Sequence, residues 1–320
     1  MNFLKKINPV AFLVLFLFSA CSKNGGVNPG GGGGGGHNYG NGAIYYDWST
    51  DGIQKITLQS GAKATEMPED VNRHAWDISL DGKTILVNTN APGTDYDANL
   101  YTISNIATGT IVSQFKYYPT QGDYTSPYLS PDGSMIAVDP TFEDGIVILD
   151  LQGNILHNLA TFQGQKISGH LVWMPDNSLL FSIGKNIYRT NQAFTSATLI
   201  KQVNFNSWGS LTASRDGSKI ALKGGNHIWM MNADGSSLVQ VTQSSQVEAA
   251  PVFSPDGKYL LVGTNYRESL AASSLWNLAI IPADGQQYNV DDGADKRVIP
   301  VIAKGGGTTV EASDGNMEWR

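Results

Sequence analysis

Three features of the sequence predict an all-β fold, a six-bladed β-propeller of four-stranded blades. The 320 residues include 36 glycines, are 41% hydrophobic and only 15% charged, and contain no long stretch with a helical period. Short apolar runs bounded by Asp-Gly or Asn-Gly recur along the chain. One hairpin pattern returns about every 40 residues, which is the spacing expected of propeller blades.

The clearest copy of this hairpin is APVFSPDGKYLLVGT at 250–264, in which two apolar strands flank a Ser-Pro-Asp-Gly turn. Pro255 fixes φ at the second turn position, Asp256 can hydrogen-bond to nearby backbone, and Gly257 accepts the left-handed conformation. The apolar flanks therefore predict a β-hairpin whose second strand is buried.

Related hairpins occur at four earlier places in the chain. They span 74–89, 126–140, 170–184 and 210–224. The turn aspartates of the five copies are 40 to 51 residues apart, at Asp81, Asp132, Asp176, Asp216 and Asp256. A third strand is predicted after each of four hairpins, at 100–105, 146–154, 186–190 and 227–235, and a more polar fourth strand follows, as at 237–243.

The two ends of the repeat region complete one further blade. Residues 43–49 and 52–59 have the pattern of a second and a third strand, so this first blade lacks its innermost strand. Residues 314–320 resemble an innermost strand with nothing after it, and Trp319 takes the place of Phe253. We expect the C-terminal strand to join the N-terminal blade and close the ring, which leaves no open sheet edge between them.

An aromatic residue followed by Ser-Pro-Asp-Gly, as at 253–257, resembles the WD40-like Pro-Asp repeat of the TolB propeller. Related blades occur in the propellers of prolyl-oligopeptidase-type enzymes. The resemblance covers residues 43–320 and departs from the pattern at Leu80, Asn177 and Arg215. It implies the six-bladed architecture. It does not imply the Tol–Pal role, because we find no counterpart of TolB's separate N-terminal domain.

The N-terminus predicts export and a lipid anchor. Residues 1–20 carry Lys5 and Lys6 before an apolar run, as in a secretory signal peptide, and the run is short for a membrane span. Phe-Ser-Ala before Cys21 resembles the lipobox of bacterial lipoproteins, although Phe18 stands where leucine is usual. The alternative is an ordinary cleaved signal with an incidental cysteine.

A lipidated Cys21 would anchor the protein to a membrane of the bacterial cell envelope. Ser22, in place of aspartate after the cysteine, favours the outer membrane. Residues 21–42 are glycine-rich and predict a flexible tether between this anchor and the propeller at 43–320. Cys21 is the single cysteine, so no intrachain disulfide forms.

The net charge and the lack of known catalytic and nucleotide-binding motifs restrict the classes of function that the sequence predicts. The formal net charge of −7 gives no basic footprint for nucleic acid. The sequence has no G-x-S-x-G elbow, H-E-x-x-H motif, Walker A loop or dinucleotide-binding fingerprint. We therefore expect no cofactor and no catalytic residues, and a non-catalytic propeller that binds a protein or glycan partner in the envelope.

Two groups of residues are candidate binding sites. Residues seven or eight places before a turn aspartate should lie where the innermost strands enter the central funnel, a plausible ligand site. The funnel candidates are Arg73, His74, Tyr124, Thr125, Trp208 and Glu248, with His170 one place nearer its turn and Asp314 in the unpaired last strand. The second candidate patch is Tyr266, Arg267 and Glu268, because insertions on repeat folds commonly form a binding face. For all of these, polar residues that merely cap strand ends are the alternative interpretation.

One catalytic alternative stays open. A metal held by His74, His170 and Glu248 would suit a metal-assisted polysaccharide lyase or hydrolase, since some propeller lyases bind a metal through histidines. These residues come from different repeats and show no metal-ligand spacing, so we predict no metal site.

Overall fold

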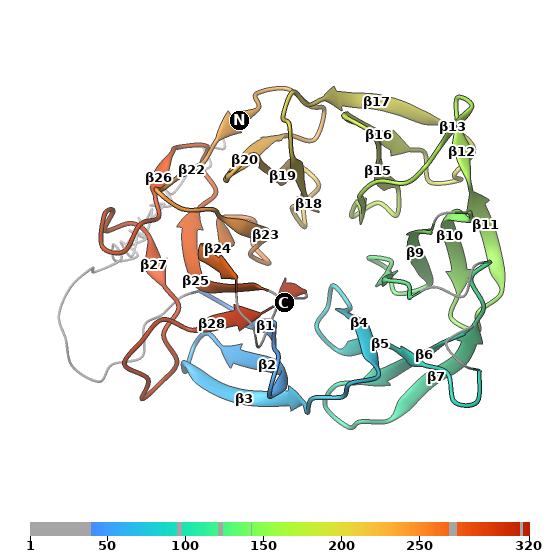
Figure 1. Cartoon of the computed structure of the whole chain (residues 1–320), viewed down its shortest axis with the longest axis horizontal. Coiled ribbons are helices and arrows are strands. Elements are labelled where there is room, and N and C mark those ends of the chain that lie inside the picture. The colour runs from blue at the N-terminus through green and yellow to red at the C-terminus, as the bar shows by residue number, and fades with distance from the viewer. Residues whose placement is uncertain (1–39, 95–97, 121–123, 142, 269–273, 314–315) are drawn as a thin grey trace, which may run out of the picture. The chain divides into compact units, whose positions relative to one another are not determined.

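The computed structural model describes residues 40–94, 98–120, 124–141, 143–268, 274–313 and 316–320. Its strands form six small antiparallel sheets arranged in a ring, a six-bladed β-propeller (Figure 1). The described part of the chain contains no helix with the length and hydropathy needed to span a membrane.

Blades 1 to 3 each contain four strands. Blade 1 consists of β29 (Met317–Trp319), β1 (Ala43–Trp48), β2 (Gly52–Thr57) and β3 (Ala62–Met67). Blade 2 consists of β4 (Arg73–Ile78), β5 (Thr84–Asn90), β6 (Asn99–Asn105) and β7 (Ile111–Tyr117). Blade 3 consists of β8 (Pro127–Leu129), β9 (Met135–Thr141), β10 (Gly145–Asp150) and β11 (Ile155–Leu159).

Blades 4 to 6 continue the ring. Blade 4 consists of β14 (Leu171–Trp173), β15 (Leu179–Ile183), β16 (Asn186–Thr190) and β17 (Ala197–Gln202). Blade 5 consists of β18 (Trp208–Ala213), β19 (Lys219–Gly224), β20 (His227–Asn232) and β21 (Val239–Gln240). Blade 6 consists of β23 (Ala249–Phe253), β24 (Tyr259–Glu268), β25 (Ser274–Pro282) and β27 (Ile299–Pro300), with β28 (Glu311–Ser313) also paired to β25.

Four short strands lie outside this pattern. β12 (Thr161–Phe162) and β13 (Gln165–Lys166) form a small hairpin after blade 3. β22 (Thr242–Gln243) pairs in parallel with β26 (Tyr288–Asn289), which ties the segment after blade 5 to the segment after β25.

The ring closes as the sequence predicts. β29 pairs with β1, and the register places Trp319 opposite Ile44 and Glu318 opposite Tyr45. The backbones of Ala43 and Arg320 exchange two further hydrogen bonds. The innermost strand of blade 1 therefore comes from the opposite end of the chain to its other three strands.

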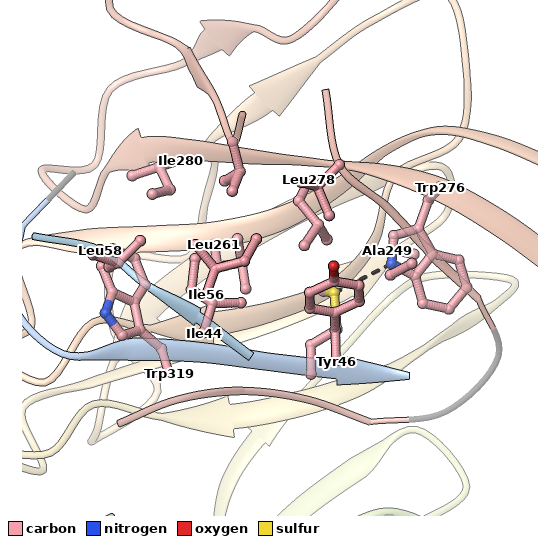
Figure 2. Packing of buried hydrophobic residues seen from close by; sticks show 14 residues of the cluster. Ile44, Tyr46, Ile56, Leu58, Ala249, Leu261, Trp276, Leu278, Ile280 and Trp319 are labelled. Carbon is pink, nitrogen blue, oxygen red and sulfur yellow. Dashed lines mark hydrogen bonds between the residues drawn. The ribbon is translucent and has the colours of Figure 1, made fainter. Parts of the chain in front are cut away.

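The apolar core lies between neighbouring blades. At the closing seam, residues of β1, β2 and β29 pack against residues of β24 and β25 (Figure 2). Trp319 is only 2% exposed, and the Trp276 indole N–H points at the Met317 sulfur at 3.2 Å. Because both faces of each blade are covered by its neighbours, the inner strands are apolar on both sides.

Candidate functional site

The turn of each inner hairpin is held by its own side chains. In blade 6, Ser254 Oγ donates to Asp256 Oδ1 at 2.7 Å and accepts from the Tyr259 N–H at 3.0 Å. Gly257 adopts φ of 68°, as the turn requires. The same Ser–Asp bond occurs at 79–81, 130–132 and 214–216. These bonds fix the end of each innermost strand and so the direction in which its side chains point.

The innermost strands surround a central channel with a volume of about 340 Å³. Side chains alternate along a strand, and the residue four places before each turn aspartate lines the channel. At the position four before the turn, the channel is lined by Asp77, Tyr128, Val172, Thr212, Val252 and, in the equivalent place of β29, Glu318. Blades 1 to 3 thus contribute a polar wall, and blades 4 to 6 a mainly aliphatic one.

One pair of carboxyl groups on the polar wall is already partnered. Arg320 Nη2 lies 2.7 Å from Glu318 Oε2 and 3.8 Å from Asp77 Oδ1. Asp77 also accepts hydrogen bonds from the backbone N–H groups of Ile78 and Leu129. Burial raises the pKa of Glu318 to about 8; Arg320 opposes that rise and Asp77 adds to it. Burial thus favours the protonated form of Glu318, whose side chain hydrogen-bonds to Asp77.

Asp139, on β9 of blade 3, is the other carboxyl group that lines the channel. Among the described residues, no side chain or backbone group donates a hydrogen bond to its carboxylate. Burial alone raises the pKa of Asp139 to about 6. At neutral pH this carboxylate is mostly ionised and only partly solvated, which costs free energy unless a ligand supplies a donor.

Arg215 crosses the channel at the turn end. It belongs to the turn of blade 5, and its Nη2 donates to the backbone oxygen of Leu80 in the turn of blade 2. Blades 2 and 5 are three places apart in a ring of six and so lie on opposite sides of the axis (Figure 1). The channel is therefore bridged at the face where the turns lie, which we call the turn face. The opposite face, where the innermost strands begin, is the start face.

Two pairs of funnel candidates come together at the start face. The His74 and Tyr124 rings stack with centroids 3.7 Å apart, and His74 Nε2 lies 2.7 Å from Asn90 Oδ1. The His170 and Trp208 rings meet edge to face at 5.1 Å. Tyr124 is 51% exposed, and His170 also lines the channel. Each pair bridges two neighbouring blades and offers an aromatic surface beside the channel.

Three other funnel candidates, Arg73, Thr125 and Glu248, make their contacts away from the channel. Arg73 donates to the Pro68 backbone oxygen and pairs with Glu69, both in the connection from blade 1. Thr125 is 3% exposed and bonds to the Tyr101 hydroxyl. They stabilise the blades themselves.

Glu248 is also buried within the blades, with 0% exposure. It accepts from His227 Nδ1 at 2.6 Å, from Thr242 Oγ1 at 3.2 Å and from Ser244 Oγ at 2.5 Å. Glu248 directly precedes β23, whose start is irregular, with a register shift between Ala249 and Val252 and φ of 40° at Ala250.

The second candidate patch lies on β24. Tyr266 stacks on Trp276, and Lys223 of blade 5 lies 6.0 Å from the Tyr266 ring centre. Arg267 forms an ion pair with Glu311 of β28, and Glu268 is exposed and pairs in register with Ser274. These contacts hold the extended β24–β25 hairpin. Asp314 and Cys21 lie outside the described residues.

The three candidate metal ligands, His74, His170 and Glu248, each make the separate contacts given above. Within the described ranges, no three His, Cys, Asp or Glu side chains come close enough to share a metal ion.

The sequence did carry a signal for the channel residues that we did not single out. Asp77 and Tyr128 occupy the position four before a turn aspartate, and Glu318 the equivalent place of the last strand, where the other blades have Val or Thr. Asp139 lies on β9, the second strand of its blade, where no position relative to the turn distinguishes it in the sequence.

Comparison with known proteins supports the fold. No family model and no curated protein matches the sequence. The structure is similar to TolB from Acinetobacter baumannii, with a TM-score of 0.56 and 20% identity over 76% of this chain. This chain covers 62% of that protein, less than two thirds of its length. A protein assigned as TolB from Agrobacterium tumefaciens gives a TM-score of 0.54 and 18% identity, covering 77% of this chain and 86% of the other. The chain therefore has a TolB-like propeller fold.

Proposed function

We propose that this chain is a lipid-anchored protein of the bacterial cell envelope that binds a partner protein at its central channel, without catalysing a reaction. The observation that carries this proposal is the channel itself. It has a polar and an aliphatic wall, is flanked by two aromatic pairs at the start face, and is bridged by Arg215 at the turn face. Convergent polar groups in a concave, partly apolar site are the usual features of a binding site.

The envelope location is supported by the N-terminal sequence. A signal-like segment, Cys21 after Phe-Ser-Ala and a glycine-rich tether suit a protein held at the membrane surface, with Ser22 favouring the outer membrane. Cys21→Ser tests the anchor. We expect the wild-type protein to sediment with membranes and the exported variant to be soluble. Membrane partitioning of the variant after signal removal would contradict lipid anchoring.

Partner binding is tested in the protein's own envelope with a photoactivatable residue. Placed at Tyr124, beside the channel on the start face, it should cross-link a partner protein on irradiation. The matched control places it at Ile155, which is 62% exposed on the outer edge strand of blade 3. Equal labelling at both positions, or no adduct at Tyr124, would contradict the proposed site. Capture of an oligosaccharide would show that the partner is a glycan and not a protein.

A further inference from the structure

Among the residues that the structure describes, one carboxylate of the channel lining has no cation or hydrogen-bond donor beside it. On the polar wall, Asp77 and Glu318 share the guanidinium group of Arg320. Asp139 faces the same channel with no donor among the described residues. The protein thus supplies a cation for one part of the wall and leaves the other part for a ligand.

Arg320 shows what kind of ligand such a wall accepts. Its guanidinium group contacts Glu318 and Asp77, while its Nε donates to the Ile78 backbone oxygen at 2.9 Å. A planar cation with several donors can satisfy carboxylate and carbonyl oxygens together, and it is more weakly hydrated than an ammonium group. The same chemistry suits Asp139, whose partly buried charge needs both a counter-charge and a hydrogen-bond donor.

The rest of the channel fits the stem of such a side chain. Val172, Thr212 and Val252 form the wall on blades 4 to 6. Basic side chains bury their methylene groups along apolar surface while the charged end reaches a polar partner. A volume of about 340 Å³ is at the lower end for ligand sites, so it suits one long side chain better than a folded segment or a sugar chain.

Resting on the proposed function, we propose that the channel receives an arginine side chain of the partner protein. Its guanidinium group binds Asp139, and its stem lies against the aliphatic wall of Val172, Thr212 and Val252. The side chain enters from the start face, because Arg215 crosses the turn end.

The test uses the full-length Cys21→Ser chain and two neutral-ended probes that differ in one group. Nα-acetyl-arginine amide carries the guanidinium, and Nα-acetyl-citrulline amide is nearly the same shape without the charge. By isothermal titration calorimetry, we expect saturable binding of the arginine probe at one site per chain, and at least tenfold weaker binding of the citrulline probe. Equal binding of the two probes, or no saturable binding of the arginine probe, would overturn the proposal.

Two variants locate the site. Asp139→Asn should weaken binding of the arginine probe by at least tenfold. Asp292 is an exposed aspartate on a loop outside the channel lining, and Asp292→Asn should leave the affinity unchanged. Unchanged binding in Asp139→Asn overturns the proposal. The comparison of the two probes uses only the parent chain, so it does not depend on whether a variant folds. Photo-cross-linking from Tyr124 distinguishes a failure of the proposed function from a failure of the arginine proposal alone. If a partner is still captured there while the arginine probe fails to bind, only the ligand class is wrong.

Discussion

Arg215 and Leu80 contact each other across the axis of the ring. They are 135 residues apart, and the Arg215 guanidinium donates to the Leu80 backbone oxygen. Both stand at the turn position that proline occupies at 131, 175 and 255. Proline has no side-chain donor, so a proline at 215 could not make this contact. The departure at Arg215 therefore supplies the bridge, and position 80 contributes a backbone oxygen that proline would present as well.

Arg215→Ala should open the turn end with little effect on stability. The side chain is exposed, so we expect the free energy of unfolding to change by less than about 0.5 kcal/mol. Access is measured with Thr212→Cys as a reporter in the Cys21→Ser background. Arg215→Ala should raise its rate of modification by a thiol reagent several-fold. Arg297→Ala, an exposed arginine paired with Asp295, is the matched control. Equal rates in all three proteins would show that Arg215 does not restrict the channel.

Trp319→Ala should weaken the closed ring strongly. Trp319 is buried at the seam where β29 joins β1, and its indole N–H donates to the Asn41 backbone oxygen at 3.0 Å (Figure 2). Loss of a buried tryptophan typically costs about 3–5 kcal/mol. Thermal or urea unfolding measures this loss. Trp319→Phe, which keeps most of the buried area, should cost less than half as much. A loss below about 1 kcal/mol in the alanine variant would mean that β29 is not needed for closure.

Glu318→Gln should change how stability depends on pH. A carboxyl group whose pKa rises from 4.5 to about 8 on folding stabilises the fold at low pH. That contribution is lost as the pH rises from about 4.5 through about 8. Glutamine stays neutral and can still donate to Asp77. The stability of the variant relative to wild type should therefore increase across this pH window. We expect a difference of at least about 2 kcal/mol at pH 9.

The measurement is the melting temperature of both proteins from pH 5 to pH 9. Glu268→Gln, exposed on β24, serves as the control and should give a curve parallel to wild type. A curve for Glu318→Gln that also runs parallel to wild type would show that Glu318 is ionised throughout.

Ser254→Ala should weaken one turn without affecting the channel. Ser254 is 2% exposed, donates to Asp256 and accepts from the Tyr259 N–H. Its loss leaves that N–H without the hydroxyl acceptor, which should cost about 1–3 kcal/mol in the free energy of unfolding. Urea unfolding tests this against Ser196→Ala, an exposed serine in the turn before β17. Equal stability of the two variants would contradict the structural role of the serine.

The fold was predictable because its signals are local and periodic. Turn residues such as Pro255 and Gly257 repeat, and Trp319 in the place of Phe253 revealed how the ring closes. Part of the channel rim was predictable for the same reason, as with His170. Glu248 was misplaced because its carboxylate hydrogen-bonds to His227, Thr242 and Ser244 within the blades, contacts that no turn motif reveals.

The remaining channel features depend on the assembled ring. The contact of Arg215 with Leu80 exists only because six blades place the turns of blades 2 and 5 opposite each other. Asp139 lines the channel from a second strand beside the short β8, and its lack of a donor follows from the packing of the blades around it. Neither feature can be derived from hydrophobic pattern or turn chemistry.

Blocking the channel tests the central claim most directly. In the full-length Cys21→Ser chain, Thr212→Cys is modified with a bulky maleimide inside the channel, and Thr198→Cys is modified in the same way on the exposed outer strand β17. Each protein is then used to capture its partner from envelope extract. We predict that the channel adduct abolishes capture of the protein that cross-links at Tyr124, and that the outer-strand adduct leaves it intact. Capture that survives the channel adduct would contradict binding at the channel.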